Sequence, residues 1–133
     1  MTSIRASSLL RRVLIVDALS SGAMGVAMFA LADVFASLLQ LPVELIREAG
    51  IILLPFAAFV GFVASRREPA RIAVWAIIAM NVVWVVDSIV LLFTGWVAPN
   101  VLGYSFVIAQ AAVVLVLADF EFLGLKRSTA VAA

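Results

Sequence analysis

The 133-residue sequence contains no cysteine and no histidine. The absence of cysteine excludes disulfide bonds and thiolate chemistry, and the absence of histidine excludes imidazole ligands to zinc, copper or haem. No serine has a neighbouring base that could activate it, and no glycine-rich phosphate loop is present. We therefore expect no catalytic residues, no metal and no cofactor, and we predict that the protein is not an enzyme.

Charged residues are scarce as well. They make up 13% of the sequence, against 66% hydrophobic residues, whereas a soluble domain carries about 25% charged residues. This composition cannot provide a polar surface, which indicates a protein whose solvent is lipid. The few basic residues flank hydrophobic stretches and form no nucleic-acid patch, so we expect membrane lipids as partners and no nucleic acid.

Four hydrophobic stretches account for most of the chain, at residues 13–39, 45–64, 71–93 and 101–122. A membrane-spanning helix needs about 20 apolar residues, so each stretch is long enough to span. Pro42 and Pro69 follow the first two stretches and suit the start of the next helix. We predict an all-α integral membrane four-helix bundle, up-down-up-down with short loops, as a single transmembrane domain over residues 1–133.

A signal peptide is the alternative for the first stretch, because Arg11 and Arg12 precede it. The apolar core of a signal peptide is only about 7–15 residues long, and residues 13–39 are much longer. A first membrane span is therefore favoured.

The basic residues predict the orientation. Eight of the nine Lys and Arg residues fall on the side of the two termini and the middle loop, and Arg47 falls on the other side. Because the side rich in Lys and Arg is cytoplasmic, we expect both N- and C-termini in the cytoplasm. The expected location is the plasma (bacterial inner) membrane, with one fixed orientation.

Asn81 and Gln110 lie near the middle of the third and fourth stretches. Counted from the ends of two antiparallel helices, they fall at the same depth, and the same register places Ser88 opposite Gly103. We predict that these helices are neighbours, that Asn81 and Gln110 hydrogen-bond, and that Gly103 allows the backbones to approach.

Asp87 is a costly residue inside the third stretch, about 9 Å from its outer end at 1.5 Å per residue. Such acids commonly belong to an ion or substrate pathway. The alternative is a structural acid, sealed among side chains and bonded to Tyr104 or Trp96, and this outcome is favoured. The candidate intramembrane polar site comprises Asp87, Trp84, Asn81, Ser88, Tyr104 and Gln110.

Small residues on the first stretch predict a helix-packing seam, because close contact between membrane helices requires them. The seam comprises Ala18, Gly22 and Gly25.

Two further acids are assigned to the membrane interfaces. Asp17 is expected to form a salt bridge with the arginines of the middle loop, and Asp33 is expected to pair with Arg47. Exposed pairs of this kind contribute only about 0–1 kcal/mol.

Two function classes follow. The first is a non-catalytic accessory, scaffolding or lipid-associated membrane component, which the lack of reactive residues favours. The second is a small transporter or channel with an acidic site at Asp87. Four helices seldom enclose a conduit, so the second class requires a homo-oligomer, and a larger membrane complex is the corresponding expectation for an accessory subunit.

Overall fold

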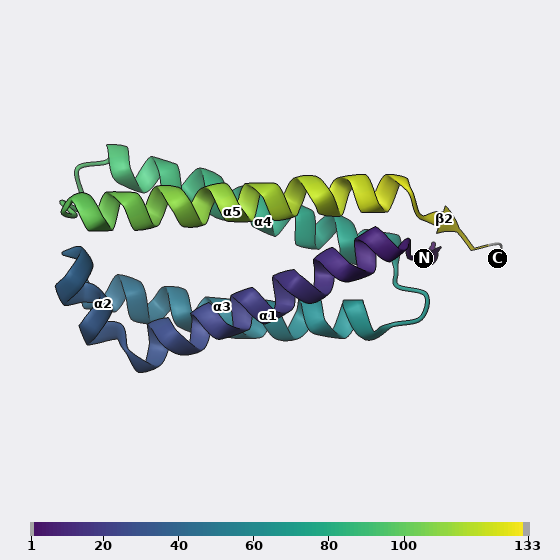
Figure 1. Ribbon diagram of the computed structural model, residues 1–133, viewed down its shortest axis with the longest axis horizontal. Coiled ribbons are helices and arrows are strands. Elements are labelled where there is room, and N and C mark those ends of the chain that lie inside the picture. The colour runs from purple at the N-terminus through teal and green to yellow at the C-terminus, as the bar shows by residue number, and fades with distance from the viewer. Residues whose placement is uncertain (1, 132–133) are drawn as a thin grey trace.

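Each hydrophobic stretch of the sequence contributes a long α-helix in the computed structural model, which describes residues 2–131. The long helices are α1 (Ser8–Ala30), α3 (Val43–Ser65), α4 (Arg71–Phe93) and α5 (Val101–Lys126). At 1.5 Å per residue each is about 34–39 Å long, enough to cross a hydrocarbon core of about 30 Å. All four are long and apolar enough to span a membrane, and they alternate in direction within a bundle (Figure 1). The predicted all-α four-helix bundle is confirmed.

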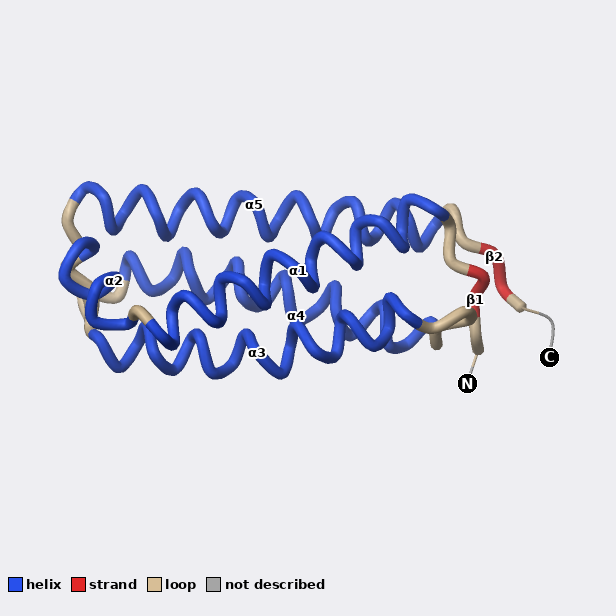
Figure 2. Tube along the Cα trace, turned by 60° about the horizontal axis from the view of Figure 1, so that its bottom comes forward, coloured by secondary structure: helices blue, strands red, loops and turns tan. Residues whose placement is uncertain are grey.

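The first predicted span, 13–39, is divided into two helices. α1 ends at Ala30, Leu31 leaves the helical conformation (φ −115°, ψ 30°), and α2 (Ala32–Leu39) follows. A continuous helix from Ser8 to Leu39 would be about 48 Å long at 1.5 Å per residue, well beyond the hydrocarbon thickness. α2 instead covers the end of the bundle opposite the termini, where it packs on α3 and α5 (Figure 2).

Two helices extend past their predicted bounds at the end of the bundle that carries both chain termini. We call this the terminal end, and the end that carries α2 the distal end. α1 begins at Ser8 rather than at 13, because the Ser7 hydroxyl caps it by accepting a bond from the Leu10 amide at 3.1 Å. α5 continues to Lys126 rather than stopping at 122. Both extensions move the intervening polar residues deeper into the bundle.

The helices pack as two pairs. α1 lies along α3, and α4 lies along α5, whereas α3 and α4 touch little although a short loop joins them. The two pairs form separate layers over much of their length and converge at the terminal end (Figure 1).

The predicted packing seam on α1 lies against α3. Gly22 faces Ala57, and Ala18 lies opposite Gly61. At Gly25 the backbones come closest, because the facing residue is also a glycine: a Cβ atom added to Gly50 would lie 2.9 Å from the carbonyl oxygen of Gly25. The seam is therefore a contact between helices, as small residues in membrane proteins commonly are.

A second close contact joins the helix pairs at the terminal end. A Cβ atom on Gly124 of α5 would lie 2.7 Å from the Cα atom of Leu10 on α1, and the Ser7 hydroxyl donates to the Gly124 carbonyl at 2.8 Å. Beyond this crossing, the short strands β1 (Ile4–Arg5) and β2 (Thr129–Ala130) pair in antiparallel fashion. The segments near the two ends of the chain are therefore paired with each other at the terminal end of the bundle.

Two hydrophobic cores fill the ends of the bundle, with polar side chains between them. The core at the terminal end contains Ile4, Leu10, Leu14, Val60, Val63, Ala64, Val74, Ile77, Ile78 and Leu125. The core at the distal end contains Met28, Ala32, Leu39, Leu41, Ile46, Val97 and Val107.

Candidate functional site

Three buried polar side chains meet where α1, α4 and α5 converge. The side-chain amide nitrogen of Asn81 donates to Oδ2 of Asp17 at 2.9 Å and to Oε1 of Glu121 at 2.8 Å. The exposed fractions are 1% for Asp17, 4% for Asn81 and 0% for Glu121. We call these three residues the buried triad; they are the only buried polar or charged residues among residues 2–131.

The two carboxyl groups of the buried triad are close neighbours. Both accept a hydrogen bond from the same nitrogen atom, at 2.9 and 2.8 Å, so this shared donor holds them next to each other. The hydroxyl of Ser21 donates to the remaining oxygen of Asp17, Oδ1, at 3.0 Å. The remaining oxygen of Glu121, Oε2, is buried and has no hydrogen-bond partner within the described part of the chain.

The predicted salt bridge between Asp17 and the arginines of the middle loop is wrong. Because α1 begins at Ser8, Asp17 lies nine residues, or about 14 Å, inside the helix. The salt bridges among residues 2–131 involve Arg47, at the distal end. Arg11, one turn from the start of α1, instead donates to the carbonyl oxygens of Ala64 and Arg66 at the end of α3.

Glu121 is absent from the predicted site residues, although the sequence carries a signal for it. It falls on the same face of α5 as Gly103, Ala111 and Ala118, three small buried residues at helical spacing. Small residues mark the face of a membrane helix that packs on its neighbours. An acid on that face is therefore an acid inside the bundle.

Trp84, Ser88 and Gln110 form a second polar cluster between α4 and α5. The indole N–H of Trp84 donates to the Gln110 carbonyl oxygen at 2.8 Å, and the Gln110 amide donates to the Ser88 hydroxyl at 3.0 Å. We call these residues the amide cluster. They are partly buried, unlike the buried triad.

The predicted bond between Asn81 and Gln110 is therefore wrong, although α4 and α5 are antiparallel neighbours as expected. Gln110 meets Ser88, which lies seven residues, or about 10 Å, along α4 from Asn81. The prediction paired residues of α4 and α5 whose numbers sum to 191, whereas Ser88 and Gln110 sum to 198. Side chains also lean toward the start of their own helix, so Asn81 and Glu121 lean toward each other across the antiparallel pair.

Gly103 does not face Ser88. A Cβ atom at Gly103 would collide with the carbonyl oxygen of Leu39 and with Pro99. The side chain of Asn100 donates to the carbonyl oxygen of Leu38 at 2.9 Å nearby. The glycine thus allows the end of α2 to approach the start of α5, a contact that the unbroken first span could not predict.

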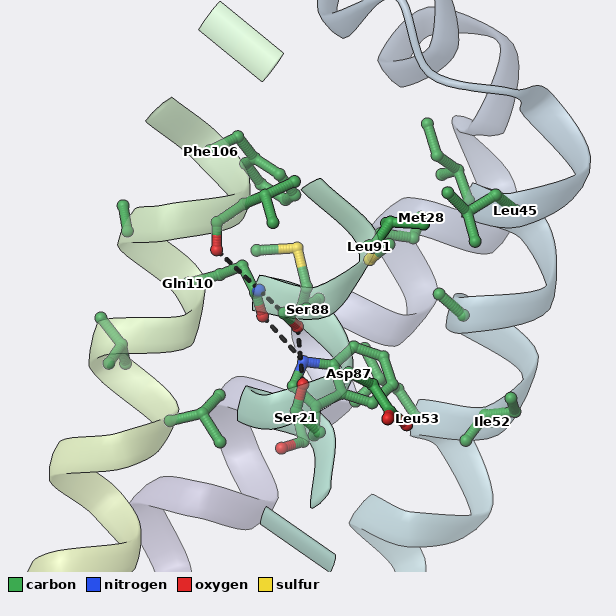
Figure 3. A pocket seen from close by; sticks show the side chains of 18 of the residues that line it. Ser21, Met28, Leu45, Ile52, Leu53, Asp87, Ser88, Leu91, Phe106 and Gln110 are labelled. Atoms are coloured by element: carbon green, nitrogen blue, oxygen red, sulfur yellow. Dashed lines mark hydrogen bonds between the residues drawn. The ribbon is translucent and has the colours of Figure 1, made fainter. Parts of the chain in front are cut away.

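A cavity of about 570 Å³ lies between the two helix pairs, beside the amide cluster (Figure 3). All four long helices contribute to its wall, which is mostly apolar. Its apolar lining includes Met24, Met28, Leu45, Ile52, Leu53, Leu91, Phe106 and Val113. Its polar lining comprises Ser20, Ser21, Glu48, Trp84, Asp87, Ser88 and Gln110. No lysine or arginine is among these described lining residues.

Asp87 lines this cavity and is exposed, so the favoured prediction of a sealed structural acid is wrong. Among residues 2–131 its carboxylate makes no hydrogen bond with Tyr104 or Trp96, whose side chains are 40% and 69% exposed. Figure 3 shows Asp87 of α4 and Leu53 of α3 on the wall of the cavity. The prediction placed Asp87 on the packed side of α4, but α3 and α4 diverge, leaving that side open.

Glu48 of α3 is a second acid of the cavity wall that the predicted site lacks. It lies five residues inside the distal start of α3, and Asp87 lies six residues inside the distal end of α4. Their depths are therefore about 8 and 9 Å at 1.5 Å per residue. The two carboxylates flank the cavity from the two helices that touch little.

The remaining predicted charges lie at the distal end. Arg47 is 4.0 Å from Asp33, and it forms a closer bond of 2.7 Å with Glu44. Both acids are largely exposed and Arg47 is partly exposed, so the contacts contribute little to stability.

No protein-family model matches the sequence, and no curated protein or solved structure is significantly similar to it. Within residues 2–131, no group of three or more His, Cys, Asp or Glu side chains could hold a metal ion. The fold defines a small polytopic membrane protein with four candidate spans.

Proposed function

We propose that this protein is a non-catalytic membrane component that binds a cationic amphiphile in the cavity between its helix pairs. The observation that carries the proposal is the pairing of an apolar cavity with two carboxylates and no basic residue. A volume of about 570 Å³ falls in the usual range for small-molecule sites, which are largely apolar with a few polar groups that fix orientation.

The apolar wall of the cavity and its two acids suggest where each part of the ligand binds. The apolar body lies among Met28, Leu53 and Phe106, and the cationic head lies between Asp87 and Glu48. A cation at this point lowers the cost of holding carboxylates inside the membrane, which is several kcal/mol for an unpaired acid at the centre of a helix. The indole N–H of Trp84 is hydrogen-bonded to the side-chain oxygen of Gln110. These two side chains therefore form part of the cavity wall and need no hydrogen bond from the ligand.

Entry from the lipid supports an amphiphile rather than a water-soluble cation. α3 and α4 touch little, and both contribute lining residues, so the cavity reaches the side of the bundle. The same cavity forms within a single chain, so binding requires no second copy.

The orientation and location form part of the proposal. Both termini lie on the cytoplasmic side of the plasma membrane, which the distribution of eight basic residues against Arg47 supports. Because the protein lacks cysteine, a single cysteine at Gly95 or at Arg67 reports sidedness without background labelling. We expect an impermeant maleimide added outside intact cells to label G95C and not R67C; the reverse pattern contradicts the orientation.

Equilibrium binding to the protein in lipid nanodiscs tests the ligand class. Tetraphenylphosphonium and tetraphenylborate have nearly the same shape and opposite charge, and empty nanodiscs correct for partition into lipid. We expect saturable binding of the cation only, weakened about tenfold in Asp87→Asn or Glu48→Gln, which corresponds to about 1.4 kcal/mol per lost charge. Asp33→Asn, an exposed acid outside the cavity, is the matched control and should bind normally. Equal binding of cation and anion, or unchanged binding in both cavity variants, would overturn the proposal.

A further inference from the structure

The buried triad presents a charge problem that its hydrogen bonds do not solve. Two carboxyl groups share one amide nitrogen at 2.9 and 2.8 Å, and both residues are almost completely buried. Two unneutralised carboxylates in a membrane interior are very unfavourable, because each needs a counter-charge or a proton.

Among residues 2–131, no basic side chain forms a salt bridge or hydrogen bond with the two carboxyl groups. Arg11 of α1 is bonded to the carbonyl oxygens at the end of α3, and Arg71 at the start of α4 is exposed. Lys126 of α5 lies over the ring of Phe122, 5.3 Å from its centre. The exposed Asp119 adds another acid on α5 and no positive charge.

A metal ion does not suit the position either. The Asn81 amide nitrogen lies against both carboxyl groups, so its N–H groups occupy the space where a shared cation would sit. The hydroxyl of Ser21 likewise presents a hydrogen to Asp17. Hydrogen-bond donors therefore face three of the four carboxyl oxygens. The fourth, Oε2 of Glu121, has no hydrogen-bond partner among residues 2–131.

We infer that the buried triad is a proton-binding site in which Asp17 and Glu121 share one proton. The new O–H bond forms on Oε2 of Glu121, the buried oxygen that has no hydrogen-bond partner among residues 2–131. In this proposal its hydrogen is donated to the Asp17 carboxylate, which shares the Asn81 donor with Glu121. Binding the proton changes the charge of the triad from −2 to −1. Every buried oxygen then has a hydrogen-bond partner.

Ser21 connects this proton site to the cavity. Its hydroxyl bonds Oδ1 of Asp17, and the same residue lines the cavity. The proton therefore exchanges with the cavity side of the bundle through Ser21. The neighbouring Ser20 also lines the cavity, but its hydroxyl bonds the backbone carbonyl of Asp17 in its own helix, so it offers a matched control.

Infrared spectroscopy of the full chain in nanodiscs at neutral pH tests the proton directly. A protonated carboxyl group gives a C=O stretch separate from that of carboxylates. We expect this band in the wild type, its loss in Glu121→Gln, and its persistence in Asp33→Asn and Asp87→Asn. Should Glu121→Gln fail to fold, uniform ¹³C-glutamate labelling of the wild-type chain should shift the band. Absence of a protonated carboxyl band, or a band that neither the variant nor the label alters, contradicts the inference.

The exchange route has its own readout. On transfer to D₂O the band shifts as deuterium replaces the proton, and we expect this shift to be several-fold slower in Ser21→Ala than in Ser20→Ala or the wild type. Equal exchange rates in the two serine variants would overturn the connection to the cavity. Both measurements are independent of whether the cavity takes a cationic amphiphile.

Discussion

The buried triad and the amide cluster are built from similar side chains, yet they lie in opposite surroundings. Each contains one amide side chain that joins neighbouring helices, Asn81 in the first and Gln110 in the second. The triad is sealed by the crossing of α1 and α5, whereas the amide cluster lines an open cavity beside the exposed Asp87. The difference arises from the spacing of the helix pairs, because similar polar groups are buried where the pairs touch and line an open cavity where they diverge.

This comparison separates stability from binding. A sealed polar group must be paired within the protein, and removing its partner leaves an unsatisfied group in a medium without water. A polar group on a cavity wall can be replaced at lower cost, since ligand, lipid or water can meet its neighbours. Substitutions in the triad should therefore affect folding, and substitutions at the cavity should affect binding.

The largest effect is expected for Asn81→Leu, which leaves the two carboxyl groups of the triad without their shared donor. We expect a loss of about 3–5 kcal/mol in the free energy of unfolding, the usual cost of removing one partner from a buried charged network. Gln110→Leu is the matched control in the amide cluster, where an interhelical bond is worth about 0.6–2 kcal/mol. Reversible unfolding in mixed micelles measures the free energy of unfolding of both variants. Equal losses in the two variants would contradict the proposed difference between the clusters.

A smaller loss is expected for Gly124→Ala, which disturbs the crossing that seals the triad. The added methyl group would lie 2.7 Å from the Leu10 Cα atom and 2.8 Å from its nitrogen, so backbone must move. Overpacking of this kind costs about 1–3 kcal/mol. Gly22→Ala is the control, because its methyl group would meet Ala57 at an ordinary distance of 3.6 Å. Thermal midpoints that fall equally for both variants would contradict the proposed role of the crossing.

The smallest effect on stability is expected for Asp87→Asn. Its carboxylate is exposed and makes no hydrogen bond within residues 2–131, so the free energy of unfolding should change by no more than about 0.5 kcal/mol. The same unfolding measurement applies. A loss of several kcal/mol would show that Asp87 has a structural role and would argue against its assignment to a ligand.

The fold could be predicted from the sequence because lipid solvent imposes simple rules. About 20 apolar residues make a span, and prolines and polar turns separate the spans. The seam residues Gly22 and Gly25 lie against α3 because small side chains are what membrane helices need at a close contact. These features depend on local sequence.

The polar contacts depend on register, which the sequence determines less directly. The apolar stretch begins at residue 13, but α1 begins at Ser8, because Ser7 caps the helix there. That difference of five residues changes Asp17 from an interfacial acid to a buried one. On α5 the observed register places Gln110 beside Ser88 rather than Asn81 and brings Glu121 into the triad. Exposure of Asp87 could not be predicted, because it depends on the divergence of α3 and α4 and not on α4 itself.

Cysteine accessibility tests the contrast between a sealed triad and an open binding cavity most directly. The protein has no cysteine of its own, so Ser88→Cys in the cavity wall and Ala118→Cys, 3% exposed beside Glu121, can be compared without background. We expect a membrane-permeant maleimide to label S88C and not A118C in nanodiscs. Tetraphenylphosphonium at a concentration near the wild-type Kd should slow labelling of S88C, and Asp87→Asn should remove most of that protection. Equal labelling of the two cysteines, or protection that Asp87→Asn leaves unchanged at the same concentration, would contradict the account.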